Sequence, residues 1–202
     1  MKRVEARHAL AIRWFHWINF PVLSLMIWSG LLIYWANDVY GVHIGGFTLF
    51  KFFPESFYST FNIAFRLAEG MSWHFTFMWL FAINGVLYVS YLTLSGEWRY
   101  LFPAGIRGKF DRAQQVAYTG IILMGAGSVV TGLAIYKPTQ LAWLEWLLGG
   151  YQLARLEHFW LTIGYVLFFV VHVVQVVRAG WNTFRAMITG YEIVKVENAS
   201  ND

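Results

Sequence analysis

Four apolar stretches divide the chain, and each is long enough to cross a lipid bilayer as a helix. They run approximately over residues 14–36, 72–94, 113–136 and 157–177, and their interiors hold almost no Lys, Arg, Asp or Glu. The hydrocarbon core of a bilayer takes roughly 20 helical residues to span. Strand-like alternation of apolar and polar positions is not evident, and a helix pairs its own backbone groups in lipid. The pattern predicts an all-α membrane protein, a bundle of four transmembrane helices.

The connections between these stretches predict short helices at the membrane surface. Phe57, Phe61 and Phe65 are spaced four residues apart in the long connection 37–71, which would place them in one stripe on a helix. Such a stripe suits either an amphipathic helix lying on the membrane or a docking surface for a partner. Further interfacial helices are expected over residues 141–148, before a Gly-Gly pair, and over 181–188.

Basic residues gather in three of the five segments outside the apolar stretches. These segments precede the first stretch, join the second to the third and follow the fourth, whereas the two other connections are largely balanced by acids. The positive-inside rule therefore predicts a multi-pass membrane protein with both termini, and the connection between the second and third stretches, in the cytoplasm. We expect a single transmembrane domain over 1–190 and a polar cytoplasmic tail over 191–202.

The composition narrows the chemistry that such a bundle can perform. The chain is 58% hydrophobic, only 13% charged and contains no cysteine, which excludes disulfides, thiolate zinc sites, iron–sulfur ligation and covalent c-type haem. The net charge of +4 is small and its basic residues lie at segment ends, so we do not expect nucleic acid as a partner. A redox role would need histidine or methionine ligands.

Four histidines lie inside the apolar stretches, where an ionisable side chain is costly and indicates a functional site. His158 and His172 are fourteen residues apart, which places them within about 40° on one helix face and roughly 21 Å apart along the axis. His74 opens the second stretch on the outer side, whereas His16 opens the first on the inner side. The depths therefore predict two pairs, His74 with His158 outside and His16 with His172 inside.

Two axial imidazoles complete a six-coordinate haem iron and favour electron transfer over oxygen chemistry. The histidine pattern thus predicts two b haems stacked across the membrane. Any one of the four, taken alone, is equally consistent with an interfacial histidine that has a satisfied hydrogen bond. Zinc or copper suits the pattern less, since the pairs would be about 20 Å apart and would lack further ligands. His8 and His43, which lie outside the stretches, are expected at the surface.

Short strings around the histidines extend the pattern to most of the chain. They read RWFHWIN at 13–19, WHF at 73–75, LEHF at 156–159 and VHV at 171–173, with connecting strings at 95–99, 109–115 and 128–134. They resemble the bacterial two-haem cytochrome b561-like family, which includes the membrane cytochrome b subunits of hydrogenases, formate dehydrogenases and thiosulfate reductases. Within it the chain looks most like subunits that accompany a molybdopterin-dependent oxidoreductase.

The resemblance implies transmembrane electron transfer in a respiratory chain. The expected partners are a periplasmic redox subunit (a molybdopterin oxidoreductase, a hydrogenase or a c-type cytochrome) and the membrane quinone pool (menaquinone or ubiquinone), with either direction of flow allowed. It also implies a quinone site near the inner haem, for which Asp111, Gln114 and Asn19 are candidates. Asp111 suits either a quinone contact or a helix cap. Arg13 suits either a haem propionate or the membrane boundary.

Two other classes of function compete with this interpretation. A self-contained oxidoreductase would pass electrons from a small molecule such as superoxide to quinone, but the balanced outer charges argue against capture of an anion. A scaffold or transporter without redox activity rests only on the number of helices, and neither inverted repeats nor broken helices are visible in the sequence.

Overall fold

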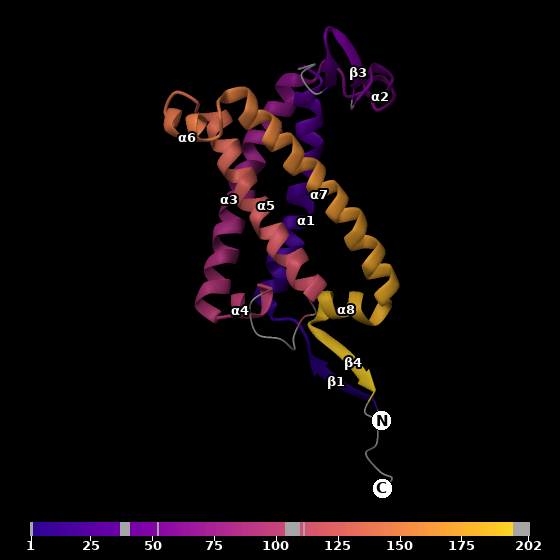
Figure 1. Ribbon diagram of the computed structural model, residues 1–202. Coiled ribbons are helices and arrows are strands. Elements are labelled where there is room, and N and C mark those ends of the chain that lie inside the picture. The colour runs from indigo at the N-terminus through magenta and orange to yellow at the C-terminus, as the bar shows by residue number, and fades with distance from the viewer. Residues whose placement is uncertain (1, 37–40, 52, 104–109, 111, 196–202) are drawn as a thin grey trace. The chain divides into compact units, whose positions relative to one another are not determined.

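The computed structural model describes residues 2–36, 41–51, 53–103, 110 and 112–195 (Figure 1). Four long helices stand out among these residues, and each is long and apolar enough to cross a membrane. The predicted architecture of four transmembrane helices is therefore confirmed. The helices are α1 (Leu10–Tyr34), α3 (Leu67–Ser95), α5 (Arg112–Tyr136) and α7 (Tyr151–Ala179).

Two of these helices begin well before the apolar stretches that predict them. Helix α3 starts at Leu67, and its first turn is stabilised by Arg66, which donates to both carboxylate oxygens of Glu69 at 2.7 and 2.6 Å. This bidentate contact raises the pKa of the Arg66 guanidinium. Helix α7 starts directly after Gly150, whose positive φ of 102° interrupts the preceding helix. Both helices therefore include a first turn that lies outside the apolar stretch from which the helix is predicted.

Short helices occur in each of the three segments for which interfacial helices are predicted. Helix α6 (Ala142–Leu147) and helix α8 (Trp181–Thr189) lie where the sequence predicts them. Helix α2 (Glu55–Thr60) does not carry the predicted stripe of three phenylalanines, because it ends before Phe61. Asn62 and Phe65 have positive φ values of 51° and 60°, which a right-handed helix cannot contain, so the continuous stripe is wrong. The fourth short helix is α4 (Trp98–Leu101).

The described residues also form two small antiparallel sheets that the sequence pattern does not predict. Strand β1 (Lys2–Ala6) pairs with β4 (Tyr191–Lys195), so the first part of the expected polar tail is structured. Strands β2 (Gly41–Ile44) and β3 (Phe47–Lys51) form a hairpin within the long first connection.

The chain divides into two compact units, residues 18–86 and residues 1–17 with 87–202. In the unit 18–86, α1 and α3 run antiparallel and approach closely at Gly70. A Cβ atom there would lie 2.6 Å from the Leu32 side chain and 3.0 Å from the Ser29 carbonyl oxygen, so glycine is required for this contact. The apolar core of the unit gathers around Leu32, Tyr58 and Ile63.

In the other unit, α5 and α7 lie side by side and antiparallel (Figure 1). Leu161 packs over Gly127, and Met124 packs over Gly164, so side chains of one helix lie directly on glycines of the other. Helix α8 follows α7 after Gly180 and ends at Gly190, which has the left-handed conformation of a helix cap.

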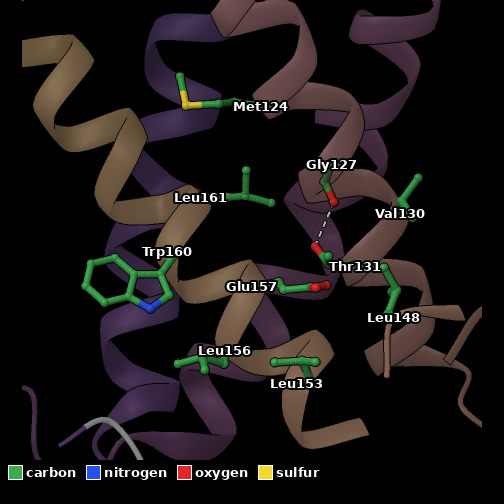
Figure 2. Close-up of a pocket in the computed structure, with 10 residues that line it drawn as sticks. All are labelled: Met124, Gly127, Val130, Thr131, Leu148, Leu153, Leu156, Glu157, Trp160 and Leu161. Atoms are coloured by element: carbon green, nitrogen blue, oxygen red, sulfur yellow. Dashed lines mark hydrogen bonds between the residues drawn. The ribbon is translucent and has the colours of Figure 1, made fainter. Parts of the chain in front are cut away.

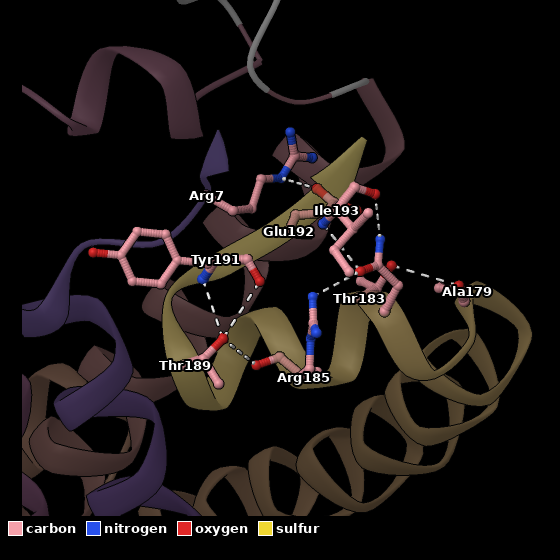
Figure 3. Close-up of polar contacts among 9 residues, drawn as sticks. Arg7, Ala179, Thr183, Arg185, Thr189, Tyr191, Glu192 and Ile193 are labelled. Atoms are coloured by element: carbon pink, nitrogen blue, oxygen red, sulfur yellow. Dashed lines mark hydrogen bonds and ion pairs between the residues drawn. The ribbon is translucent and has the colours of Figure 1, made fainter. Parts of the chain in front are cut away.

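Strand β4 is fixed to α8 by side-chain hydrogen bonds (Figure 3). The Asn182 side chain donates to the Ile193 carbonyl at 3.0 Å and accepts from the Ile193 amide at 3.1 Å. The Thr189 hydroxyl accepts from the Tyr191 amide at 3.2 Å, and Arg7 pairs with Glu192 at 3.5 Å. Both ends of the described chain are therefore held against α8.

Candidate functional site

His16 and His172, the pair predicted for the cytoplasmic side, lie together in the structure. His16 comes from the second turn of α1 and His172 from the last third of α7, and their ring centroids are 6.0 Å apart. Phe168 stacks on His172 with a centroid distance of 5.8 Å and an interplanar angle of 7°. His16 Nδ1 is buried and makes no hydrogen bond. Two imidazoles from different helices thus lie close together, with His16 partly buried and His172 exposed.

His158 is oriented by a hydroxyl group from the neighbouring helix. Its Nδ1 lies 2.8 Å from Thr131 Oγ1, and Thr131 is only 3% exposed. The Thr131 hydroxyl also lies 2.7 Å from the Gly127 carbonyl, to which it can donate its proton. With the proton there, the hydroxyl accepts from His158 Nδ1, and the tautomer that makes this contact carries its lone pair on Nε2.

His74 has the same arrangement within the unit 18–86. Its Nδ1 lies 3.0 Å from Ser29 Oγ, and Ser29 is fully buried. The Ser29 hydroxyl also lies 3.1 Å from the Met26 carbonyl, and with its proton donated there it accepts from a His74 tautomer whose lone pair is on Nε2. A hydrogen bond of this kind at the second ring nitrogen is typical of histidines that bind a metal through the first.

Comparison with known proteins agrees with this geometry. A family model described as prokaryotic cytochrome b561 matches residues 7–190. The chain belongs to this family. It is also 30% identical over 210 residues to a protein of Azospira oryzae named "Putative protein-methionine-sulfoxide reductase subunit YedZ1", and the alignment covers 94% of this chain and 99% of that relative. No solved structure matches the chain.

Membership of the family means that the cytochrome is a multi-pass membrane protein that carries haem b and transfers electrons across the membrane. The donor set fits this cofactor, because imidazoles whose Nδ1 contacts a hydroxyl group can offer Nε2 as an axial ligand to haem iron. Among the described residues, no three His, Cys, Asp or Glu side chains come close enough to hold a metal ion by themselves. His74 and His158 belong to different units, and their pairing stays a prediction.

The predicted quinone residues have different surroundings in the cytochrome. Asn19 accepts a hydrogen bond from Asn84 at 2.9 Å within the unit 18–86. Gln114 is exposed in the first turn of α5, and Asp111 lies outside the described residues. Gln115, which follows Gln114, is fully buried. Its side chain donates to the Tyr100 carbonyl at 3.0 Å and so connects α5 to α4.

Arg13 lies against the end of α8. It donates a hydrogen bond to the Ile188 carbonyl, and its guanidinium packs on Gly190, where a Cβ atom would approach within 3.2 Å. Its Nε is buried and makes no hydrogen bond, so a donor remains available beside the first turns of α1. This position agrees equally with contact to a propionate and with a structural role at the membrane boundary.

Three polar residues of the site were missed by sequence reasoning. Ser29 and Thr131 gave no signal, because a lone hydroxyl in an apolar stretch usually bonds its own helix and its partner lies on another helix. Glu157 did give a signal, since it is the one carboxylate in the stretch 157–177 and directly precedes His158. Its Oε2 is buried and makes no hydrogen bond.

Proposed function

We propose that the cytochrome transfers electrons through two bis-histidine b haems, between a redox enzyme on the outer face of the bacterial inner membrane and the membrane quinone pool. The observation that carries this proposal is the repeated hydroxyl–histidine contact, from Ser29 to His74 and from Thr131 to His158. A surface histidine needs no such arrangement, because water satisfies both ring nitrogens. An axial ligand needs one nitrogen fixed as a donor and the other left as a lone pair.

In this proposal His16 and His172 hold one haem and His74 and His158 hold the other. When bound, each haem supplies a reversible one-electron carrier. The protein contributes the ligands, their orientation and an apolar surrounding. Arg13 Nε is the proposed donor to a propionate, since it is buried and has no hydrogen bond to the protein.

The proposed redox partner is a molybdopterin-dependent reductase. The support is the relative from Azospira oryzae, which is named as a subunit of a protein-methionine-sulfoxide reductase and aligns over nearly its full length. A reductase consumes electrons, so the flow would run from quinol to the partner. For exchange with the quinone pool at the cytoplasmic end we propose Gln114, which is exposed at the start of α5, together with Asp111.

The experiment that tests the haem assignment is a pyridine haemochromogen assay on detergent-purified protein. We expect about two b haems per chain for the natural sequence and about one for His172→Ala, since one axial ligand of one haem is removed. His8→Ala is the matched control, because His8 precedes α1 and is not a proposed ligand. Two haems in the His172→Ala variant would contradict the assignment of this ligand.

Partner transfer is tested with the same preparations. Decylubiquinol is added with the co-purified reductase subunit and its oxidised substrate, and turnover is compared between the natural sequence and His172→Ala. We expect turnover only with both haems present. Equal turnover with the one-haem variant would contradict a path through both haems.

A further inference from the structure

A groove of about 590 Å³ lies between α5 and α7, beside the end of α6 (Figure 2). Its volume is in the range of sites for small organic ligands. The walls are almost entirely apolar, and the side chains that matter most to the argument are Val130, Leu153, Trp160 and Leu161. The quinone residues proposed above lie at the opposite end of α5 from the residues that line this groove.

Two polar side chains, Glu157 and Thr131, are among the described residues that line this apolar groove. The Glu157 side chain extends from α7 toward Thr131 on α5, as Figure 2 shows. Its Oε2 is buried and accepts no hydrogen bond from the protein. A buried acceptor without a donor is unfavourable, so a ligand that brings a donor gains affinity by making this hydrogen bond. The groove therefore selects for a ligand with a hydrogen-bond donor at one place and apolar surface elsewhere.

The other walls indicate the shape and charge of that ligand. Trp160 offers a flat indole on which a ring can stack. Leu153 and Trp160 are about half exposed at the rim, so an apolar tail can leave the groove toward lipid. Among the described residues that line the groove there is no Lys or Arg, so the phosphate of a phospholipid would have no cationic partner in that set. A neutral ring that carries a hydroxyl group and an apolar tail meets all three conditions.

We propose that this groove is a binding site for the reduced, hydroquinone form of a membrane quinone, with one ring hydroxyl donating to Glu157. The site is additional to the exchange site proposed at the cytoplasmic end. The proposal concerns binding alone, and it rests on the proposed function only in its choice of a quinone as the ligand. Because Glu157 precedes His158, a ring held here lies next to a proposed haem ligand.

Photolabelling with a hydroquinone whose decyl tail carries a diazirine tests the proposal on the detergent-purified full chain. Labelled residues are mapped by mass spectrometry, and we expect them on α5 around Gly127 and on α7 around Leu161. The oxidised, quinone form of the same probe is the first control. It has no ring hydroxyl to donate, so we expect about tenfold weaker labelling at the same concentration, as one lost hydrogen bond predicts.

Two variants distinguish the contribution of the Glu157 acceptor from that of the groove volume. Glu157→Leu removes the acceptor, and we expect about tenfold weaker hydroquinone labelling. Val130→Trp keeps Glu157 and fills the groove, which should lower labelling to a similar extent. Val116→Trp is the matched control, since Val116 is exposed on the same helix and does not line the groove. Haem content and monodispersity, measured on every variant, show which ones remain folded, and Val130→Trp tests the groove even if Glu157→Leu is unstable.

Four results would overturn the proposal. The first two are equal hydroquinone labelling of Glu157→Leu and the natural sequence, and equal labelling by the quinone and hydroquinone probes. The third is labelling confined to the opposite end of α5 and α7. The fourth is a native mass spectrum in which the natural sequence retains a phospholipid that Glu157→Leu has lost. The haem assay distinguishes this failure from failure of the proposed function. If the protein holds two haems but Glu157→Leu is labelled as strongly as the natural sequence, only the groove site is refuted. If protein without haem is labelled specifically in the groove, only the electron-transfer proposal is refuted.

Discussion

Replacing Thr131 with valine tests the arrangement that carries the proposed function. Valine has nearly the shape of threonine, but it lacks the hydroxyl that shares a hydrogen bond with His158 Nδ1 at 2.8 Å. Because Thr131 is only 3% exposed, water cannot readily replace the lost acceptor. The variant leaves the imidazole in place but no longer fixes which nitrogen carries the proton.

The size of the effect follows from the hydrogen bonds that are lost. Removing the partner of a metal-binding histidine typically weakens metal affinity by about 10–100-fold, which corresponds to about 1.4–2.7 kcal/mol. A buried donor left without an acceptor costs about 1–3 kcal/mol, which is the same range. We therefore expect the haem at His158 to dissociate about 10–100 times more readily, and the haem at His16 and His172 to be unaffected.

Haem transfer to excess apomyoglobin, followed by the change in Soret absorbance, measures this difference. The natural sequence should lose haem slowly, whereas Thr131→Val should lose half of its haem in a faster phase. Thr162→Val is the matched control, because the Thr162 hydroxyl donates to the backbone carbonyl of His158 at 3.0 Å and leaves the ring unchanged. If Thr131→Val and Thr162→Val lose haem at the same rate, the Thr131 hydroxyl does not orient an axial ligand and the reasoning is refuted.

Two further predictions concern the unit 18–86. Ser29→Ala should weaken haem retention at His74 by a similar factor of about 10–100, measured by the same transfer assay, and unaltered retention would remove the support for His74 as a ligand. Gly70→Ala should destabilise the packing of α1 on α3 by about 1–3 kcal/mol, because a Cβ atom there would lie 2.6 Å from a side chain of α1. Gly85→Ala has open space around its new Cβ atom, so an equal loss of thermal stability in both variants would contradict the packing argument.

The features that the sequence predicts correctly are those that depend on neighbouring residues. Span length and apolar content are local properties, so four long helices could be expected from the pattern alone. The depth of a histidine follows from its position in its own helix. For this reason His16 and His172, which are far apart in the chain, could be expected at a similar depth, and their ring centroids lie 6.0 Å apart, while their role as a ligand pair stays a prediction.

The features that the sequence pattern misses depend on contacts between distant residues or on single backbone angles. Strands β1 and β4 pair the two ends of the chain, and neither five-residue segment has enough alternation to predict a strand. The end of α2 depends on the left-handed conformation of Asn62 and Phe65, which phenylalanine rarely adopts. The hydroxyl partners of the histidines could not be found either, because Ser29 and Thr131 act across a helix interface.

The two kinds of histidine in the structure are held in different ways, and the difference bears on their chemistry. Ser29 and Thr131 each lie within hydrogen-bond distance of a carbonyl one turn earlier in their own helix and of a histidine Nδ1. When the hydroxyl donates to that carbonyl, it accepts from Nδ1, and the lone pair of the imidazole is on Nε2. The His172 ring instead stacks on Phe168, a contact that orients the ring plane and favours neither tautomer. In the proposed ligand assignment, an iron at His74 or His158 would therefore meet an imidazole whose tautomer is favoured by its hydroxyl partner, whereas binding at His172 would itself select the tautomer.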